Sequence, residues 1–471
     1  MNESDLLRPI MNNATTICAT ATAPGGAIGV IRISGPQAIQ NVTPIFAPHN
    51  PHKKLNECQT HTVVYGNIRT VEGEIIDDVL LTIFRAPHSY TGEESIEISY
   101  HGSFYISQKI IELLLEQGCQ MAMPGEFTQR AFLNGKMDLC QAEGVADLIA
   151  SQSEAMHKQA MNQMRGGISN KLKSLRDRLI QISSLIELEI DFSDHEDIQF
   201  ASRDEVLNIA SDILDTITRL INSFQAGNAI KNGIPVAIIG QTNAGKSTLL
   251  NTLLQENKAI VSKTHGTTRD IIEDTINIDG LTFRFIDTAG IRETTDTIEK
   301  LGIERSFNAI DKAEIILLVH DIHQNQEALE RFLQTIQSHI VDKTVILVLN
   351  KIDDTSSTPT KQFSLPSYKQ ISISAQKGLH IKELKQLIVS LSSPSKTNSE
   401  DSIITNIRHY EALKKAQSSL LRVIQNIKQD LSCDFISQDL REAIFHLSDI
   451  IGEVTPDNIL KQIFSTFCIG K

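Results

Sequence analysis

A chain of 471 residues is too long for a single hydrophobic core, so two to four domains are expected. Its 41% of hydrophobic and 21% of charged residues are typical of a soluble globular protein, and its net charge of -13 argues against binding nucleic acid through an overall positive field. The six cysteines form no C-x-x-C pair, the acidic first residues exclude a signal peptide, and no apolar run approaches the roughly 20 residues of a membrane span. We therefore expect a cytoplasmic protein in a reducing compartment.

The first 136 residues have the pattern of an α+β domain. Residues 103–116 have helical periodicity, and the turn Pro124-Gly125 leads into a second helix. Strands are predicted from short segments rich in β-branched residues, at 15–21, 27–33, 61–67, 79–84 and 95–100.

Two helical stretches flank an α/β segment. From Asp138 to about Gln225, apolar residues recur at spacings of three and four, which predicts helices. We interpret the acidic run 191–197 as a solvated helix junction, because its spacing gives no octahedral set of metal ligands. A Ser/Pro-rich linker at 392–400 precedes a second helical stretch at 403–467. Neither stretch buries its apolar stripe alone, so we expect the two to pack together.

The predicted fold is a multidomain α/β protein. The N-terminal α+β domain comprises residues 1–136, and the helical domain comprises 137–232 and 396–471. Residues 233–395 alternate strands with helices, which predicts an inserted domain with a mostly parallel sheet.

The inserted domain begins with Gly240-Gln241-Thr242-Asn243-Ala244-Gly245-Lys246-Ser247, between an apolar strand and a helix. This pattern predicts a phosphate-binding loop, because its glycines let successive N–H groups point at phosphate oxygens and the helix adds its positive dipole end. We expect Lys246 to contact the β- and γ-phosphates and Ser247 to bind Mg²⁺. An ordinary turn between strand and helix is the alternative for this stretch alone.

Four further motifs follow in the order of a Ras-like P-loop GTPase domain. A threonine in Gly266-Thr267-Thr268 can complete the Mg²⁺ coordination, as can, through water, the carboxylate in Asp287-Thr288-Ala289-Gly290. In Asn350-Lys351-Ile352-Asp353, Asp353 can accept hydrogen bonds from N1–H and the amine of guanine, a donor pair that adenine lacks. Ser374-Ala375-Gln376 would support the base with main-chain N–H groups. Each motif alone has an alternative as a plain loop, but all five in order indicate GTP binding and disfavour an ATPase.

The sequence indicates the mechanism of GTP hydrolysis less directly than it indicates GTP binding. Ile291 occupies the position where Ras-like proteins carry a water-orienting glutamine, so hydrolysis is negligible or uses other groups. The carboxamide of Asn243 can help hold a monovalent cation, which would supply the positive charge of an arginine finger. Three polar residues after Gly290 are further candidates, with solvated loop residues as the alternative: Arg292, Glu293 and Glu299.

Several motifs lie outside the GTP-binding domain and have no use in an ordinary GTPase. They are Gly29-Val30-Ile31-Arg32-Ile33-Ser34-Gly35, Tyr90-Thr91-Gly92-Glu93, Pro124-Gly125-Glu126-Phe127, Gln141-Ala142-Glu143 and Phe467-Cys468-Ile469-Gly470-Lys471. With the nucleotide motifs, they resemble the MnmE (TrmE) family of tRNA-modifying GTPases over nearly the whole chain. One departure is the segment 99–103, which is less glycine-rich than in the family.

The resemblance implies a homodimer whose N-terminal domain dimerises and binds 5,10-methylenetetrahydrofolate, with 5-formyltetrahydrofolate as an analogue. With an FAD-dependent partner, MnmG (GidA), in a heterotetramer or larger assembly, family members add a carboxymethylaminomethyl or aminomethyl group to C5 of the wobble uridine of certain tRNAs. Their GTP hydrolysis is activated by K⁺, which promotes association of the two GTP-binding domains.

The resemblance also assigns residues outside the nucleotide contacts. Glu299 matches a catalytic glutamate that orients the attacking water through a second water, beside the catalytic Lys246. Cys468 matches a functional thiol of unassigned chemistry, and a small buried hydrophobe is its alternative. Four residues fall at folate-contacting positions, and without the resemblance the cations among them would be taken as surface residues: Arg32, Glu97, Lys136 and Lys471.

The remaining assignments concern GTP and its ions. The K⁺ ligands match Asn243, Ser262, Thr264 and Thr267, and the Mg²⁺ ligands match Ser247 and Thr268. The full set of GTP contacts comprises Asn243, Ala244, Gly245, Lys246, Ser247, Thr248, Ser262, Lys263, Thr264, His265, Gly266, Thr267, Thr268, Asp287, Thr288, Ala289, Gly290, Asn350, Lys351, Asp353, Ser374, Ala375 and Gln376.

A regulatory GTP switch in ribosome or RNA assembly is the alternative function. Such a switch has no need for the folate-contacting residues of the N-terminal domain. Binding of a folate analogue by that domain therefore discriminates between the two functions.

Overall fold

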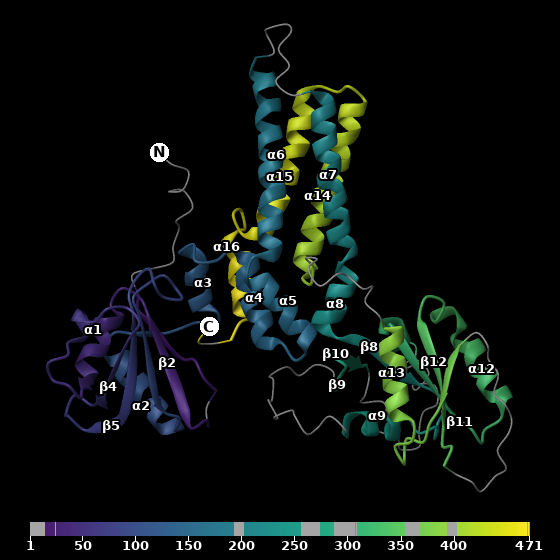
Figure 1. Cartoon of the computed structure of the whole chain (residues 1–471), viewed down its shortest axis with the longest axis horizontal. Helices are drawn as coiled ribbons and strands as arrows, with labels where there is room; N and C mark the ends of the chain where they lie inside the picture. The colour runs from purple at the N-terminus through teal and green to yellow at the C-terminus, as the bar shows by residue number, and fades with distance from the viewer. Residues whose placement is uncertain are drawn as a thin grey trace. The chain divides into compact units, whose positions relative to one another are not determined.

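The structure is a computed structural model that describes residues 15–23, 25–192, 202–255, 274–286, 307, 309–353, 368–392, 403–468 and 470 (Figure 1). They belong to two compact units: residues 1–146, 163–177 and 444–471 form the first, and residues 147–162 and 178–443 form the second. Within these described ranges, no helix is both long enough and apolar enough to cross a bilayer.

A seven-stranded sheet with the strand order β3-β4-β5-β6-β2-β1-β7 organises the first unit. Neighbouring strands are antiparallel except for the parallel pair β1 and β7. The five predicted strands are present, whereas β3 and β7 are too short to produce an alternating pattern. The strands are β1 (Ile17–Thr20), β2 (Ile28–Ser34), β3 (Phe46–Pro48), β4 (Thr62–Arg69), β5 (Ile75–Phe84), β6 (Ser95–His101) and β7 (Gln120–Met121).

The two faces of this sheet differ. Ile31 and Ile98 belong to a core that includes residues of α2 (Phe104–Glu116) on one face. Because side chains alternate along a strand, their neighbours Arg32 and Glu97, which are paired in the register of β2 and β6, lie on the opposite face. We call this opposite face the outer face.

Helices from distant parts of the chain complete the first unit. Leu139 and Ala142 share a core cluster with Leu460, Phe464 and Phe467 from the C-terminal end. The helical elements with residues in this unit are α1 (Ala38–Val42), η2 (Thr43–Ile45), η3 (Leu55–Glu57), α2, α3 (Glu126–Leu133), α4 (Leu139–Ala150), α5 (Glu154–Met164), α6 (Gly167–Asp191), α15 (Cys433–Ile451) and α16 (Asp457–Ser465).

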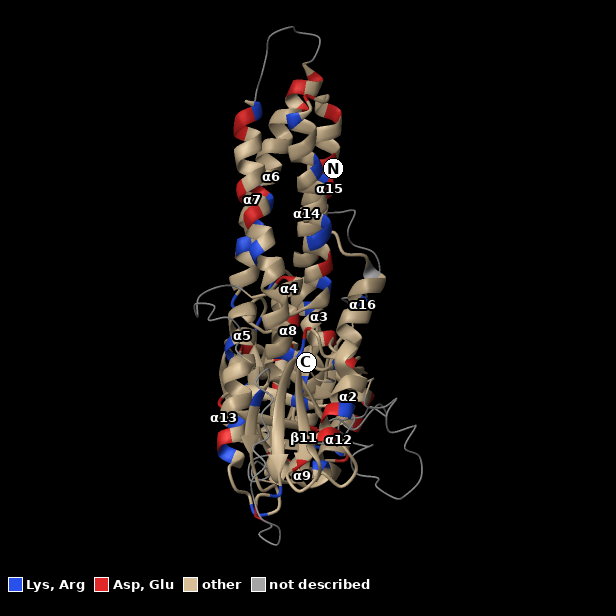
Figure 2. Ribbon diagram, turned by 90° about the vertical axis from the view of Figure 1, so that its right-hand side faces the viewer, with Lys and Arg blue, Asp and Glu red and all other residues tan. Residues whose placement is uncertain are grey.

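In the second unit, α7 (Arg203–Asn222) packs against α14 (Ile407–Lys428). The Gln417 amide donates a hydrogen bond of 2.9 Å to the Thr218 hydroxyl between these helices. The prediction that the two helical stretches pack together is therefore confirmed. Acidic and basic residues are interspersed along α6, α7 and α15 (Figure 2).

The second unit also contains a six-stranded sheet in the order β13-β12-β11-β8-β10-β9, parallel except for β9 and β10. Its central strands are continuously apolar because core clusters cover both faces. This confirms the predicted mostly parallel sheet. The elements are β8 (Ile234–Ile239), β9 (Asp274–Ile278), β10 (Leu281–Phe285), β11 (Ile315–Asp321), β12 (Thr344–Asn350), β13 (Lys369–Ser372), α8 (Phe224–Asn232), α9 (Lys246–Gln255), α12 (Gln326–Ile336), η4 (Gln337–His339) and α13 (Ile381–Leu391).

Candidate functional site

The phosphate-binding loop joins β8 to α9 and depends on two glycines. Gly240 has a φ of +147°, and a Cβ there would lie 2.1 Å from the Val319 carbonyl oxygen. Gly245 has a φ of +92°, and a Cβ there would lie 2.2 Å from Nδ2 of Asn350. Both positions therefore require glycine, and the loop can curl closely around an anion.

Lys246 begins α9 and folds back onto this loop. Its Nζ donates hydrogen bonds to the carbonyl oxygens of Gly240 (2.8 Å) and Gln241 (2.7 Å). Burial lowers the pKa of Lys246. Ser247 and Thr248 follow in the first turn of α9, so the sequence motif and the start of a helix coincide as predicted.

Asn350 connects three of the predicted motifs. It is 2% exposed, its Nδ2 donates to the Ala244 carbonyl oxygen (2.9 Å), and its Oδ1 accepts from the Ala375 N–H (2.9 Å). The structure therefore brings together the phosphate-binding loop, the Asn350–Asp353 motif and the Ser374–Gln376 motif at one edge of the sheet.

The next residue, Lys351, is held by a residue that the sequence analysis missed. Lys351 Nζ lies 2.7 Å from Oδ2 of Asp321, and the Ile322 N–H donates to the Asn350 carbonyl oxygen (3.1 Å). Burial is the largest single influence and raises the pKa of Asp321, but the hydrogen bonds from Lys351 and from the His323 N–H, together with the positive charge of Lys351, outweigh it, so the pKa is lowered overall. An acidic residue at the carboxyl end of a mostly apolar strand is the signal that points to Asp321.

Asp353 has the character of a hydrogen-bond acceptor. A hydrogen bond from Ser374 lowers the pKa of its carboxyl group, and Lys377 Nζ lies 3.7 Å from its Oδ2. An ionised carboxylate beside two buried motif residues suits the N1–H and amine donors of guanine.

Part of the predicted nucleotide and folate set lies outside the described residues. These positions are Ser262, Lys263, Thr264, His265, Gly266, Thr267, Thr268, Asp287, Thr288, Ala289, Gly290, Ile291, Arg292, Glu293, Glu299 and Lys471. Among the described residues, no group of three or more His, Cys, Asp or Glu side chains is arranged to hold a metal ion.

A second polar site lies on the outer face of the first unit. Glu97 Oε1 accepts from Nε of Arg32 (2.9 Å) and lies 2.8 Å from its Nη2. The Arg32 Cζ lies 5.4 Å from the ring centre of Tyr90 and 5.7 Å from that of Phe127. Two aromatic rings and a carboxylate therefore fix the guanidinium in one orientation.

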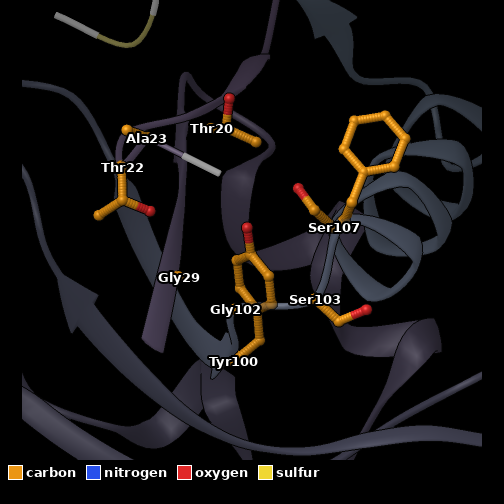
Figure 3. A pocket seen from close by; sticks show the side chains of 9 residues that line it. Thr20, Thr22, Ala23, Gly29, Tyr100, Gly102, Ser103 and Ser107 are labelled. Carbon is orange, nitrogen blue, oxygen red and sulfur yellow. The ribbon is translucent and has the colours of Figure 1, made fainter. Parts of the chain in front are cut away.

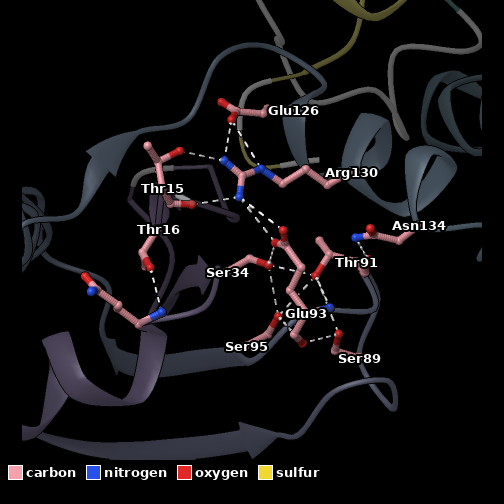
Figure 4. A network of polar contacts seen from close by, with 11 residues as sticks. Thr15, Thr16, Ser34, Ser89, Thr91, Glu93, Ser95, Glu126, Arg130 and Asn134 are labelled. Atoms are coloured by element: carbon pink, nitrogen blue, oxygen red, sulfur yellow. Dashed lines mark hydrogen bonds and ion pairs between the residues drawn. The ribbon is translucent and has the colours of Figure 1, made fainter. Parts of the chain in front are cut away.

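A buried network holds the loop that carries Tyr90 (Figure 4). Arg130 is 5% exposed, lies 2.8 Å from Oε1 of Glu126 and 3.3 Å from Oε1 of Glu93. Glu93 also accepts from the Ser34 hydroxyl (2.8 Å). These contacts explain why two separate motifs outside the GTP-binding domain occur together: each supplies one carboxylate to Arg130.

Lys136 does not join Arg32 and Glu97. Its Nζ donates to the Pro87 carbonyl oxygen (2.9 Å), and no hydrogen bond or ion pair among the described residues connects it to the other two. It stabilises the other end of the loop that carries Tyr90.

The C-terminal residues reach the outer-face site. The Gly470 carbonyl oxygen lies 3.4 Å from Nη1 of Arg32, and the Cys468 carbonyl oxygen accepts from the Gly125 N–H (3.3 Å). Cys468 itself is exposed, whereas Phe467 is buried. The alternative of Cys468 as a small buried hydrophobe is therefore wrong.

A cavity of about 110 Å³ lies on the other side of the same sheet, next to the start of α2. Figure 3 shows the Tyr100 hydroxyl pointing toward Thr20 and Thr22, with Ser107 of α2 nearby. Because Tyr100 belongs to the α2-side core, this cavity is separate from the site of Arg32 and Glu97.

Comparisons with known proteins cover both units. A family model described as "GTP-binding protein TrmE N-terminus" matches residues 16–136, and one described as "MnmE helical domain" matches residues 139–468. A tRNA modification GTPase MnmE of Parabacteroides distasonis is 56% identical over 460 residues, which is 97% of this chain and 100% of that protein. The proteins of the same name from Bacteroides fragilis (strain YCH46) and Porphyromonas gingivalis are 55% and 48% identical, each over 98% of this chain and over 100% and 98% of their own lengths.

Proposed function

This chain belongs to the MnmE (TrmE) family of tRNA modification GTPases. We propose that it adds a carboxymethylaminomethyl or aminomethyl group to C5 of the wobble uridine of certain tRNAs in the cytoplasm. It would act as a K⁺-activated GTPase together with an FAD-dependent partner of the MnmG (GidA) type. The one-carbon donor in this proposal is 5,10-methylenetetrahydrofolate. The main observation behind this proposal is that one chain contains both the guanine-nucleotide motifs joined by Asn350 and the ion pair of Arg32 with Glu97.

The domain roles follow from the two sites. We assign tetrahydrofolate binding and dimerisation to residues 1–136, GTP hydrolysis to residues 233–395, and the helical domain to residues 137–232 and 396–471. The two glycines that exclude a Cβ from the phosphate-binding loop, together with the donors around it, fit the phosphates of GTP. Ser247 and Thr268 would hold Mg²⁺, which supplies charge neutralisation at the phosphates when bound.

The proposed K⁺ site rests on Asn243, which has a left-handed backbone with a φ of +63° within the phosphate-binding loop. Its carboxamide and Ser262, Thr264 and Thr267 would be the ligands. We expect replacement of K⁺ by Na⁺ to slow GTP hydrolysis sharply and Asn243→Ala to abolish the difference, as measured by phosphate release in each salt. Equal rates in the two salts for the unaltered protein would remove Asn243 from the mechanism.

Glu97 is suited to a pterin ring. Both contacts between Arg32 and Glu97 use Oε1, so within the described part of the chain Oε2 remains available to accept from ring N–H groups. Arg32, Lys136 and Lys471 would bind the carboxylates of the same ligand at different points along its length. The chemical class that this donor and acceptor set favours is a flat heterocycle with an anionic tail.

The outer face also supports the proposal of a homodimer. Val63, Tyr65 and Leu80 on the neighbouring strands β4 and β5 are 51%, 49% and 47% exposed. They alternate with core residues, so they lie together on the outer face. A contiguous exposed apolar area of this kind is typical of a protein–protein contact, and a second copy of the chain is the proposed occupant.

Reconstitution with the FAD-dependent partner, GTP, the folate donor and unmodified tRNA tests the proposal. Mass spectrometry of tRNA nucleosides should detect the modified uridine. Its absence would favour the regulatory GTP switch. Calorimetry with 5-formyltetrahydrofolate provides a second measurement, in which Arg32→Ala should weaken binding and Lys54→Ala, an exposed cation of the same unit, should not.

A further inference from the structure

The cavity beside the start of α2 contains a buried tyrosine that neither of the two sites above uses. Tyr100 is 6% exposed, and its ring lies across Gly29 of β2, where a Cβ would come within 2.3 Å of the ring Cζ. Its hydroxyl points into the cavity, toward Thr20 and Thr22 (Figure 3). Within the described part of the chain, this hydroxyl has no hydrogen-bond partner. Because a buried phenol ordinarily has one, the cavity is a place for a ligand that supplies it.

The start of α2 borders the same cavity. Ser103, which precedes the helix, and Phe104 and Ser107 of its first turn line the cavity. The backbone of Ser103 is extended, as at a helix N-cap, but its side chain makes no capping hydrogen bond. The first N–H groups of a helix have no partners within it, and the helix dipole gives this end a partial positive charge. The end of α2 therefore favours an anionic ligand.

Hydroxyl groups reach the cavity from three elements and one loop. Thr20 ends β1, Tyr100 belongs to β6 and Ser107 belongs to α2. The Thr22 hydroxyl oxygen, in the loop after β1, accepts from the Val30 N–H (2.9 Å), so it can donate its own proton to a ligand. Donors that converge from several directions suit the tetrahedral oxygens of a phosphate group better than the two coplanar oxygens of a carboxylate.

Backbone contacts fix the walls of the cavity. The Gly102 N–H donates to the Ala27 carbonyl oxygen (3.1 Å), and a Cβ at Gly102 would lie 2.0 Å from the Gly26 carbonyl oxygen. The segment between β1 and β2 therefore approaches the end of β6 too closely for any residue other than glycine at this position. This close approach fixes the start of α2 relative to the segment before β2, as a binding site requires.

The size and charge of the cavity agree with a small anion. Its volume of about 110 Å³ is several times what one water molecule needs, so a group of a few heavy atoms fits. No lysine, arginine, aspartate or glutamate is among the described residues that line it. The carboxylate of Asp77 lies beside the segment that leads into α2, but His101 engages both of its oxygens, through Nδ1 (2.7 Å) and the backbone N–H (2.8 Å). An anion in the cavity would thus be bound by neutral N–H and O–H donors.

We propose that this cavity binds a phosphate group, with the Tyr100 hydroxyl as a buried donor and the first turn of α2 as the source of positive potential. Free inorganic phosphate and a phosphodiester of bound RNA are the two sources of this group, and both present the same tetrahedral oxygens. The RNA source rests on the function proposed above, whereas the free anion does not. In either case the site is separate from the site of Arg32 and Glu97.

Ordered water is the alternative occupant of the cavity. Water would also satisfy the Tyr100 hydroxyl, but it would give the protein no affinity for phosphate at this position. Removal of the hydroxyl would then leave phosphate binding unchanged, so this substitution separates the two occupants.

The experiment titrates the full chain with inorganic phosphate in a calorimeter at constant ionic strength, with Mg²⁺ and a non-hydrolysable GTP analogue in excess to fill the phosphate-binding loop. We expect Tyr100→Phe to weaken phosphate binding by about tenfold or more, because it keeps the ring and removes one hydrogen bond to a charged group. Ser107→Ala should weaken binding less, because Ser107 is only half-buried. Tyr105→Phe is the matched control: it removes the same oxygen from an exposed tyrosine of α2 that does not line the cavity, and it should retain the affinity.

A second titration with unmodified tRNA distinguishes the two sources. If Tyr100→Phe weakens the binding of both ligands, the site takes a phosphodiester of RNA, and if it weakens only the binding of inorganic phosphate, the site takes the free anion. Failure of the unaltered protein to bind tRNA would contradict the proposed function but leave the phosphate titration valid.

Two results overturn the site itself. The first is that the unaltered protein binds no phosphate, and the second is that Tyr100→Phe and Tyr105→Phe bind phosphate equally well. The melting temperature of each variant is measured alongside, and a loss of affinity that accompanies unfolding also counts against the site. An unchanged melting temperature together with weakened binding supports it.

Discussion

At the residue scale, the lysine of the Asn350–Asp353 motif depends on a carboxylate from another strand. Asp321 fixes Lys351 Nζ at 2.7 Å, and Lys351 has a left-handed backbone with a φ of +73°. We expect Asp321→Asn to weaken GTP binding about fivefold, because a charge-assisted hydrogen bond at a partly exposed position contributes about 1 kcal/mol. Titration with a fluorescent GTP analogue measures this, with the exposed Asp342→Asn of the same domain as the control. Identical affinities for the two variants would show that Asp321 does not position Lys351.

Lys246 gives the nucleotide site a pH dependence. Burial lowers its pKa in the nucleotide-free protein, whereas adjacent phosphates favour the charged amine and raise the pKa in the complex. Binding therefore takes up a proton once the pH exceeds the lowered value. GTP affinity should be full below that value and fall by up to about tenfold per pH unit as the pH rises toward the ordinary lysine value of about 10.4. Calorimetric affinities that stay constant from neutral pH to that value would contradict this.

At the element scale, the loop that carries Tyr90 depends on the buried pairs of Arg130 with Glu93 and Glu126. Removal of one partner leaves two carboxylates buried without compensation, which costs about 3–5 kcal/mol. We expect Arg130→Ala to reduce the free energy of unfolding of the first unit by that amount, as measured by amide hydrogen exchange in β1 and β2. Lys109→Ala, which breaks an ion pair whose members are both 40% exposed, should cost less than about 1 kcal/mol.

The sequence was most informative where periodicity and motifs coincide. The strands around Arg32 and Glu97 alternate regularly and were predicted, and so was the parallel sheet, whose strands are apolar on both faces. The contacts of the Asn350 side chain with the Ala244 and Ala375 backbones followed from the positions of these motifs at strand ends. In each case a local pattern was sufficient.

Other features depend on contacts that no local pattern encodes. Asp77 and Asp321 are single acidic residues within strands, and only their tertiary partners His101 and Lys351 distinguish them from other carboxylates. The resemblance assigned Lys136 to the folate-contacting residues, and its hydrogen bond to Pro87, which is set by the path of a loop, could not be read from the sequence. The short strand β7 is defined by its parallel pairing with β1, a tertiary contact that its two residues do not encode.

At the scale of the whole molecule, the exposed apolar residues of the outer face predict self-association. We expect Leu80→Glu to convert a dimer into a monomer, because a charge buried in the contact would be desolvated without a partner. Light scattering coupled to size exclusion measures the mass. Val71→Glu, at an apolar residue that is 76% exposed and lies outside the strands, is the control and should not change the mass. A monomeric unaltered protein would refute the proposed homodimer.

The contact between Gly470 and Arg32 has a consequence for biosynthesis. The two residues are 438 positions apart, and the whole GTP-binding domain is translated between them. At typical elongation rates, Gly470 emerges roughly 20 to 90 s after Arg32. The sequence of the nucleotide-binding domain is therefore complete in the nascent chain well before Gly470 can contact Arg32 of the amino-terminal sheet. A ribosomal product that ends after residue 395 but before residue 468 would contain the nucleotide-binding domain while lacking the carboxy-terminal side of the Arg32 site.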